Sequence, residues 1–542
     1  MNTSMMLFYS SGVLAVGFAA AGAFFFAYKR HYKPALTVSL VLSVIFSIYT
    51  LIAQFLRYYS LHVYIDFAAW PELLNSIIVK GYPASSIQGF LLGQSPLYHW
   101  FAAHFTPFLY LFALPFKLAP RPETIMVLNF LVMLSAIIPL YKLAALTQGN
   151  KRFARFVVVL FLWYPTFQYI TLYGFEMLRL SIPILLWMIY FWESRKSFSY
   201  FIFVILAILI REDVGLTVGM FGIYILLLKQ VKHARIKGIV TCVLGFGGFL
   251  IITKMLMPLF SATPGSNHIV AKLLDHYGNT PFEIVKNMFL QHGVPGSGWL
   301  NPIKWANIAM LFLPFIFVPF LAPKPLLGIL ASVGLGLVSY SITHISYMLY
   351  YISPAIPFIF YAFIKAWPRL ISLSLWERVG VRAGKHDALM CAVLAGALIS
   401  NIWFGPSLIS LQFWFRDLRP ASFRTQDFHW SSYRITDHHK NIATFVNLIP
   451  DEAIVSAQEF SFPRFFRKKG IMRFPRLESD NGRIKADYVF LDITNNGLSA
   501  ESPVVHLIKD EDIRGVMDNP DEWRLIDSDG AYFLYKRIAD VL

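Results

Sequence analysis

Apolar stretches recur along the first 404 residues of the chain and are separated by shorter polar segments. Most of them approach the roughly 20 residues that an α-helix needs to cross a bilayer, and several are shorter. We therefore expect a mainly α-helical, polytopic membrane protein with about 11–13 spans. The expected spans are residues 10–28, 35–55, 124–144, 153–173, 177–193, 198–210, 214–229, 236–259, 304–321, 325–342, 346–365 and 388–404.

One long, semi-apolar interruption between these stretches, residues 57–123, carries ionisable side chains and is not expected to cross the bilayer. Within it, residues 108–119 (FLYLFALPFKLA) are apolar but too short for a comfortable span. If they crossed, the basic loops that follow would face the opposite side of the membrane. We therefore expect an amphipathic or re-entrant helix there, lying on the membrane face, and a similar placement for the apolar parts of 68–92.

The pattern changes after residue 404, where short apolar runs alternate with a segment of helical spacing. Such alternation is typical of a small α/β domain. We therefore expect residues 1–404 to form the membrane domain and residues 405–542 to form a separate α/β domain. Its expected elements are a helix at 442–449, strands at 453–457, 470–474 and 486–493, and a hairpin at 523–537 with Asp529-Gly530 in the turn.

Charge is distributed unevenly between these two parts. The chain carries a formal charge of +16, with 56% hydrophobic and only 14% charged residues. Residues 405–542 hold 18 basic and 20 acidic side chains, which leaves 29 basic and 11 acidic ones in the first 404 residues. Basic residues that gather in the loops between spans place those loops in the cytoplasm. No basic stripe with interleaved exposed aromatics lies in a soluble part, so nucleic-acid binding is not expected.

This orientation places the loop 57–123 and the C-terminal domain outside the cytoplasm. Ionisable side chains close to a membrane are costly and usually face a cavity or a partner. Several independent segments bring such side chains to the outer face, which predicts a site between membrane and solvent. A substrate with a lipid tail and a polar phosphate head would suit it. The candidate residues are Asp66, His104, Glu176, Arg211, Glu212, Asp213 and His344.

Asp66, in YIDFAAW, is the candidate general base or metal ligand. The alternative is that Asp66 caps a helix starting at Phe67, and its position alone favours neither role. For Glu176, an i, i+3 ion pair with Arg179 is the slightly favoured interpretation. His104 precedes Thr-Pro and could simply hydrogen-bond the turn.

The block Arg211-Glu212-Asp213 lies between two apolar runs. A short loop needs polar residues, which is the simpler interpretation. However, arginine matches phosphate geometry, and two neighbouring carboxylates could orient it or hold a divalent cation such as Mg²⁺ or Mn²⁺. His344 adds a further outer group, and Tyr347, Tyr350 and Tyr351 are predicted to be interfacial aromatic anchors.

The chain resembles the domain-of-unknown-function family 2079 over about residues 55–540, and the order of the motifs is more specific than any one of them. The motifs are YIDFAAW, HFTPFLYLFALPF, PTFQYITLYGFEMLRL, REDVGLTVGMFGIYILLL, LPFIFVPFLAPKPLLGIL, HISYMLYYISPAIPF and the tail IPDEAIVSAQ, RKKGIMRFP and ADYVFLD. Members are polytopic membrane proteins that look like glycosyltransferases of the GT-C fold. Family members often have His-Pro where this chain has Gly174-Phe175, and a lysine where it has Arg211.

The resemblance implies a membrane glycosyltransferase that uses a polyprenyl-phosphate-linked sugar, with an acidic residue of the first outer loop in catalysis. Carried over, it makes Asp66 the catalytic acidic residue, with His104, Glu176 and the block Arg211-Glu212-Asp213 as its motif partners. We expect Asp66 to be the general base of an inverting transfer, and His344 to join His104, Glu176 and Arg211 in binding the substrate. Glu212 and Asp213 would hold a divalent cation if one is used. The expected setting is a bacterial inner membrane, with the C-terminal domain outside the cytoplasm.

Two other classes of function stay open on the sequence. A transporter or flippase of lipid-linked or polar substrates would need charges at mid-membrane depth or broken helices in paired positions. The sequence shows no inverted repeat, and its charges fall at span ends. A non-catalytic membrane scaffold, whose outer domain binds envelope components, is the other alternative.

Overall fold

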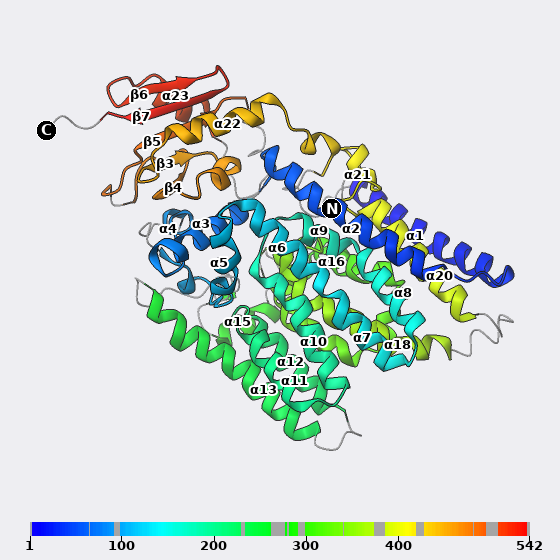
Figure 1. Ribbon diagram of the computed structural model, residues 1–542. Helices are drawn as coiled ribbons and strands as arrows, with labels where there is room; N and C mark the ends of the chain where they lie inside the picture. Colours follow the sequence, from blue (N-terminus) through cyan, green and yellow to red (C-terminus); the bar gives the residue numbers. More distant parts are fainter. Residues whose placement is uncertain are drawn as a thin grey trace.

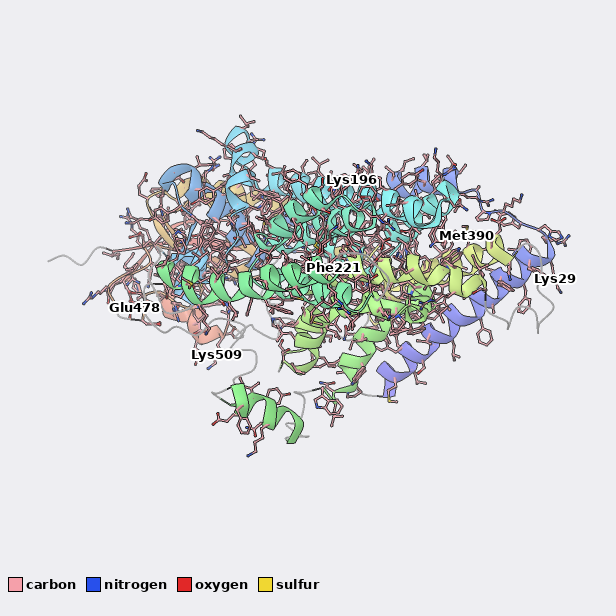
Figure 2. All side chains as sticks on the ribbon, turned by 90° about the horizontal axis from the view of Figure 1, so that it is seen from below. Lys29, Lys196, Phe221, Met390, Glu478 and Lys509 are labelled. Carbon is pink, nitrogen blue, oxygen red and sulfur yellow. The ribbon has the colours of Figure 1, made fainter. Side chains whose placement is uncertain are left out.

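The computed structural model describes residues 3–63, 65–91, 98–228, 234–261, 277–278, 281–290, 299–339, 341–372, 385–418, 428–480, 482–494 and 508–538. Helices make up the membrane part, and a five-stranded sheet lies at one end of the molecule (Figure 1). Figure 2 shows Glu478 and Lys509, from the C-terminal part, at one end and Lys29 at the other. The predicted class, a multi-span helical protein with a small C-terminal α/β region, is confirmed.

The first half of the chain begins with two long helices and then enters the loop region, where the elements are short. Its elements are α1 (Thr3–Lys29), α2 (Leu36–Tyr59), α3 (Ile65–Lys80), β1 (Ala84–Ser85), α4 (Ser86–Leu91), β2 (Tyr98–His99), α5 (Leu109–Leu118), α6 (Pro122–Ser135), α7 (Ile137–Gln148), α8 (Lys151–Leu162), α9 (Pro165–Leu172), α10 (Ser181–Glu193), α11 (Ser197–Ile208), α12 (Val214–Leu226) and α13 (Ala234–Ile251).

The second half alternates regular helices with 3-10 turns before the sheet begins. Its main elements are α15 (Pro281–Leu290), α16 (Pro302–Phe312), α17 (Leu335–Val338), the 3-10 helix Tyr350–Ala355, α18 (Ile356–Ile371), α20 (Lys385–Phe404), α21 (Leu411–Trp414), α22 (Asp437–Leu448), β3 (Ile454–Ala457), the 3-10 helix Glu459–Arg464, β4 (Gly470–Arg473), β5 (Tyr488–Asp492), α23 (Asp510–Met517), β6 (Trp523–Ser528) and β7 (Tyr532–Arg537).

Within the described ranges, six helices are long and apolar enough to cross a membrane by themselves. A seventh span results if α8 and α9, which meet at 51°, are taken together. Pro165 begins α9, and its missing N–H accounts for the break. The predicted number of about 11–13 counted the shorter apolar helices, such as α11 and α12, as separate spans.

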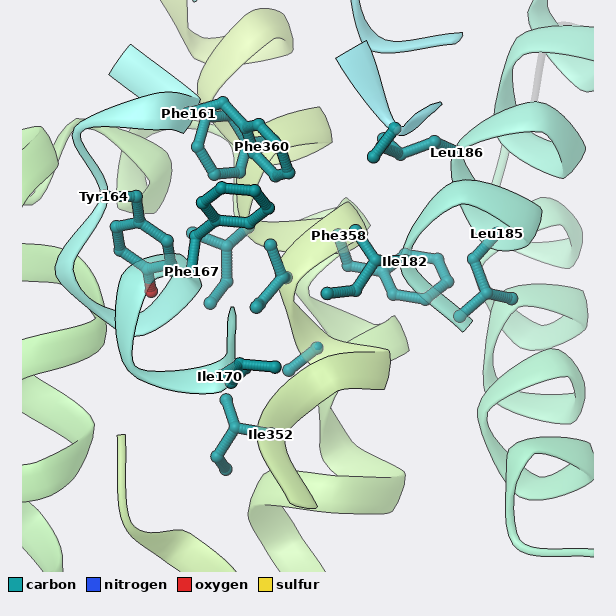
Figure 3. Close-up of a cluster of buried hydrophobic side chains, with 14 of the residues drawn as sticks. Phe161, Tyr164, Phe167, Ile170, Ile182, Leu185, Leu186, Ile352, Phe358 and Phe360 are labelled. Carbon is teal, nitrogen blue, oxygen red and sulfur yellow. The ribbon is translucent and has the colours of Figure 1, made fainter. Parts of the chain in front are cut away.

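The centre of the membrane part is filled by aromatic and branched side chains from α8, α9, α10 and α18 (Figure 3). Phe161 lies 4.4 Å from Phe167 and 5.2 Å from Phe360, measured between ring centroids. Peripheral helices instead expose apolar side chains, for example Phe18 on α1 and Val243 on α13. A helix that is apolar on its outer side is expected where lipid replaces water.

The segment 108–119 forms the short helix α5, as predicted. Leu114 and Leu118 on this helix are 65% and 88% exposed, while Leu109 and Phe116 are buried. One side of α5 therefore packs on the protein and the other is an apolar face open to a membrane surface. The nearby strands β1 (Ala84–Ser85) and β2 (Tyr98–His99) form a small antiparallel pair.

The C-terminal sheet has the strand order β4-β3-β5-β7-β6. Strand β3 is parallel to both β4 and β5, whereas β7 pairs antiparallel with β5 and β6. These strands lie where the sequence predicted them. Gly530 in the β6–β7 turn has a φ of +87°, which explains why the turn uses glycine.

The loop region and the C-terminal sheet share one hydrophobic core. Leu61, Ala68 and Ile87 pack with side chains of α22, β3 and β5. The Ser86 hydroxyl oxygen also accepts a hydrogen bond of 2.9 Å from the amide of Ile471 on β4. In Figure 1 the sheet lies directly over α3 and α4. The loop 57–123 and the C-terminal domain are therefore on the same side of the helical bundle.

Candidate active site

A cavity of about 220 Å³ lies where α3, the start of α12 and the 3-10 helix Tyr350–Ala355 meet. The seven candidate residues from the sequence all line it, although they come from five separate segments. Trp70, Trp100 and Tyr351 supply much of the aromatic wall. The lining residues expected from the sequence are Asp66, His104, Glu176, Arg211, Glu212, Asp213 and His344.

Asp66 is the second residue of α3, and its carboxylate is held by two tyrosines. Its Oδ2 atom accepts hydrogen bonds from the Tyr173 hydroxyl at 2.9 Å and the Tyr350 hydroxyl at 3.3 Å. The helix-cap interpretation is wrong, because Asp66 lies inside the first helical turn and its carboxylate faces these phenols. Burial raises the pKa of Asp66, and the two hydrogen bonds and the nearby His104 oppose that rise.

Glu212 joins the loop region to the start of α12. Its Oε1 atom lies 2.8 Å from Nδ1 of His104, and its Oε2 atom accepts a 3.0 Å hydrogen bond from the amide of Phe105. The Glu212 side chain is 1% exposed and that of His104 is 20% exposed. Both carboxylate oxygens of Glu212 are thus occupied by groups of the loop.

Arg211 is buried and is oriented by the residue two positions later. Its Nε and Nη2 atoms donate to the two carboxylate oxygens of Asp213 at 2.8 and 2.5 Å. Its Nη1 atom lies 3.6 Å from Oε1 of Glu176, and its guanidinium carbon lies 6.0 Å from the ring centre of Tyr351. The bidentate pair fixes the guanidinium plane while Nη1 remains directed toward the cavity wall that Glu176 forms.

Glu176 therefore pairs with Arg211, and the predicted i, i+3 pair with Arg179 is wrong. Glu176 has extended backbone (φ −156°) and precedes a short 3-10 helix, so helical spacing does not apply to it. The Arg179 guanidinium instead donates to Asn129 and to the carbonyl of Gly174. Burial raises the pKa of Glu176 to about 7, although Arg211 and His104 counteract the shift.

His344 lines the same cavity, next to Tyr351. Its ring lies 4.3 Å from that of Tyr351, between centroids, and its Nδ1 atom is 3.2 Å from the Thr343 hydroxyl. Tyr350 and Tyr347 are 5% and 1% exposed. The prediction that these tyrosines anchor the protein at the membrane interface is wrong, since Tyr350 donates to Asp66 and Tyr347 is buried in the bundle.

Sequence reasoning missed the role of Tyr173, which lies three residues before Glu176. The segment YGFEMLR carries several polar groups, but no periodicity indicates that a phenol there reaches α3. Tyr173 and Tyr350 come from segments far apart in the chain, and their rings are 5.2 Å apart where they meet over Asp66.

A divalent cation at Glu212 and Asp213 stays a prediction. In the part of the chain that the structure describes, no three side chains of the His, Cys, Asp and Glu type are grouped as a metal site. The oxygens of Glu212 accept from the loop, and those of Asp213 accept from Arg211. These two carboxylates, as arranged, orient the loop and Arg211.

The fold of the chain is similar to that of a solved structure, ArnT from Cupriavidus metallidurans bound to undecaprenyl phosphate. The likeness has a TM-score of 0.54 at 12% sequence identity and covers 94% of this chain and 99% of that one. These values show a shared fold, and the fold is therefore GT-C-like. The class of molecule is an integral membrane protein with a GT-C-like helical domain and a C-terminal sheet.

Within that class, the chain belongs to the family described as predicted membrane proteins, DUF2079, which matches residues 57–510. The resemblance seen in the sequence motifs is thereby confirmed. Comparison with curated proteins finds no match.

Proposed function

We propose that this protein transfers a sugar from a polyprenyl-phosphate donor to an acceptor hydroxyl, with inversion at the anomeric carbon. The observation that carries the proposal is one cavity lined by both the Asp66 carboxylate, which two tyrosines hold, and the oriented guanidinium of Arg211. The GT-C-like fold supports it, since the similar ArnT structure holds undecaprenyl phosphate. The reaction would take place on the outer face of a bacterial inner membrane.

In this reaction the acceptor oxygen attacks the anomeric carbon and its proton passes to Asp66. The new glycosidic C–O bond forms as the C–O bond to the phosphate breaks. The electron pair of the broken bond leaves with the polyprenyl phosphate. A single displacement of this kind inverts the configuration at the anomeric carbon.

Arg211 is suited to the phosphate end of the donor. Its bond to Asp213 fixes the guanidinium plane, and a fixed cation stabilises charge that develops on a leaving group without first reorganising. His104 and His344 line the same cavity and add donors for phosphate or sugar oxygens.

Asp66 has the environment of a general base. A carboxylate with a raised pKa takes up a proton more readily than an exposed aspartate, provided it is ionised at the working pH. The hydrogen bonds from Tyr173 and Tyr350 to Oδ2 hold the carboxylate in place and favour its ionised form.

The test is sugar transfer by the purified full-length protein in lipid nanodiscs, with labelled polyprenyl-phosphate sugars as donors and an envelope extract as acceptor. The Asp66→Asn variant should lose transfer by at least about 100-fold, as expected for loss of a general base. The control is Asp480→Asn, because the Asp480 side chain is 59% exposed and lies in the C-terminal domain.

Full transfer by Asp66→Asn at normal protein levels would remove Asp66 from the mechanism. Movement of the labelled lipid across a vesicle membrane by the wild type, without any glycosylated product, would favour a flippase over a transferase.

A further inference from the structure

The turn between α9 and the following 3-10 helix Met177–Leu180 carries two residues that contact different groups of the cavity. Tyr173, at its start, donates to Asp66 at 2.9 Å, and Glu176, at its end, lies 3.6 Å from Arg211. Between them Gly174 has a φ of +105°, a conformation that other residues rarely adopt. A Cβ on Gly174 would also lie 3.0 Å from the ring of Phe67, next to Asp66 in α3.

Two buried side chains hold this turn through a single carbonyl group. The Gly174 carbonyl oxygen accepts a hydrogen bond of 2.7 Å from Nδ2 of Asn129 and another from Nη1 of Arg179. The same Nη1 atom donates to Oδ1 of Asn129 at 2.9 Å. Asn129 lies on α6, so the turn is tied to a helix that supplies none of the groups lining the cavity.

Burying the Arg179 guanidinium costs free energy, because its charge is removed from water. Its side chain is 0% exposed. Among the described residues, its Nε and Nη2 atoms have no hydrogen-bond acceptor. An apolar side chain of similar size would avoid this desolvation cost. Buried, partly unsatisfied polar groups that persist call for an explanation beyond stability.

The guanidinium of Arg179 lies next to a residue that contacts Asp66. Its central carbon lies 5.7 Å from the ring centre of Tyr173, the phenol that donates to Asp66. A cation at this distance from an aromatic ring attracts its electrons and holds the ring in place. Arg179 thus contacts Tyr173 and the Gly174 carbonyl at once, and its charge also acts on Glu176 and Tyr350.

We propose that Arg179 and Asn129 are positioning residues, which clamp the Gly174 turn so that the Tyr173 hydroxyl stays on Asp66. The proposal rests on the proposed function, because it assigns these residues to the same transfer reaction. Neither residue contacts the cavity. We assign their main effect on the reaction to Tyr173, because both hold the turn that carries it.

A double-mutant cycle in the transfer assay tests this pathway. Tyr173→Phe and Arg179→Met should each lower kcat, Arg179→Met by about 100-fold, because a displacement of about 1 Å at a reacting group can cost that much. The double variant should be no slower than the slower single variant, because both changes remove the same hydrogen bond. Multiplicative losses in the double variant would overturn the proposal.

The pH dependence of kcat provides a second test, because a purely structural role for Arg179 would leave it unchanged. Loss of the Tyr173 hydrogen bond removes a group that favours ionised Asp66, so the acid limb of kcat should move to higher pH. Arg179→Met and Tyr173→Phe should move it by the same amount. If the acid limb of kcat shifts in Tyr173→Phe but not in Arg179→Met, the proposed clamp is wrong.

Three further variants, with a matched control, keep the test valid if Arg179→Met does not fold. Asn129→Leu removes the second donor to Gly174 and should produce the same shift of the acid limb. Arg179→Lys keeps a charged donor and should stay within about tenfold of the wild-type rate. Gly174→Ala should resemble Arg179→Met, whereas Gly247→Ala is the matched control, because a Cβ there meets no atom within 4 Å.

The outcomes separate this inference from the proposed function. If Asp66→Asn keeps full transfer, both fail. If Asp66→Asn is inactive but the losses of Tyr173→Phe and Arg179→Met multiply, only the clamp is wrong.

Discussion

His104 and Glu212 are 108 positions apart in the chain, yet Nδ1 of His104 lies 2.8 Å from Oε1 of Glu212. The other oxygen of Glu212 accepts from the amide of Phe105. One buried carboxylate therefore fixes the loop region against the segment that carries Arg211 and Asp213. This connection sets the distance between the loop that supplies Asp66 and the arginine proposed to bind phosphate.

Glu212→Ala should destabilise the protein by about 2 kcal/mol, because it leaves the partly buried Phe105 amide and His104 imidazole without their acceptor. Glu212→Gln should cost less, since its amide oxygen can still accept from Phe105. Thermal unfolding in detergent measures both. An equal loss in the two variants would show that the charge, and not the hydrogen bond to Phe105, is what Glu212 contributes.

Arg211→Gln should weaken binding of a short-chain polyprenyl phosphate by roughly 100-fold, the effect of losing a charged hydrogen-bond donor. Arg211→Lys should lose about tenfold, because an ammonium group cannot form the bidentate pair with Asp213. Isothermal titration with the protein in nanodiscs gives the dissociation constants. Arg235→Gln, on an exposed residue of α13, is the control, and equal affinities in all four proteins would contradict a phosphate site at Arg211.

Much of the site could be predicted because membrane topology restricts where ionisable groups lie. Each candidate was weak alone, but the positive-inside rule placed all of them on one face, and all of them line the cavity. The ion pair between Glu176 and Arg179 that helical spacing predicted does not form. The spacing i, i+3 brings side chains together only on a helix, and Glu176 has extended backbone before a 3-10 turn.

The partners of Asp66 could not be predicted for a different reason. Tyr173 and Tyr350 are two of 27 tyrosines, and nothing in their local sequence distinguishes a buried hydrogen-bond donor from an interfacial anchor. Their contact with Asp66 depends on the angle between α8 and α9 and on where the 3-10 helix Tyr350–Ala355 packs. Such tertiary arrangements leave no periodic signal in the chain.

The attachment of the C-terminal sheet should depend on Glu72. This buried carboxylate accepts from the Ser85 hydroxyl at 2.8 Å and from the Ser86 amide at 2.7 Å, and the Ser86 hydroxyl also donates to it. Ser86 in turn accepts from the amide of Ile471. In Glu72→Ala, hydrogen exchange in peptides covering β4 should be about tenfold faster, which corresponds to about 1.4 kcal/mol of lost local protection.

The matched control for that experiment is Glu511→Ala, because the Glu511 side chain is 71% exposed and lies on the far helix α23. Unchanged exchange of β4 in Glu72→Ala would mean that the shared apolar core, which includes Ala68 and Ile87, holds the sheet without this network.

Binding of a short-chain polyprenyl phosphate at Arg211 should weaken as the pH rises through the range where Glu176 titrates. Burial raises the pKa of Glu176 to about 7, so the carboxyl is neutral below that pH and charged above it. The charged form neutralises Arg211 and repels a phosphate anion. We expect the dissociation constant of a short-chain polyprenyl phosphate to increase roughly tenfold, or about 1.4 kcal/mol, between pH 6 and pH 8.

Other ionisable groups lie near Glu176, namely His104, Asp66, Arg211 and Arg179. The phosphate itself gains charge near pH 6, which acts in the opposite direction. Glu176→Gln retains all of these and removes only the carboxyl group. The pH dependence that this variant loses therefore belongs to Glu176. If the curves of wild type and Glu176→Gln run parallel from pH 6 to pH 8, Glu176 does not compete with the phosphate for Arg211.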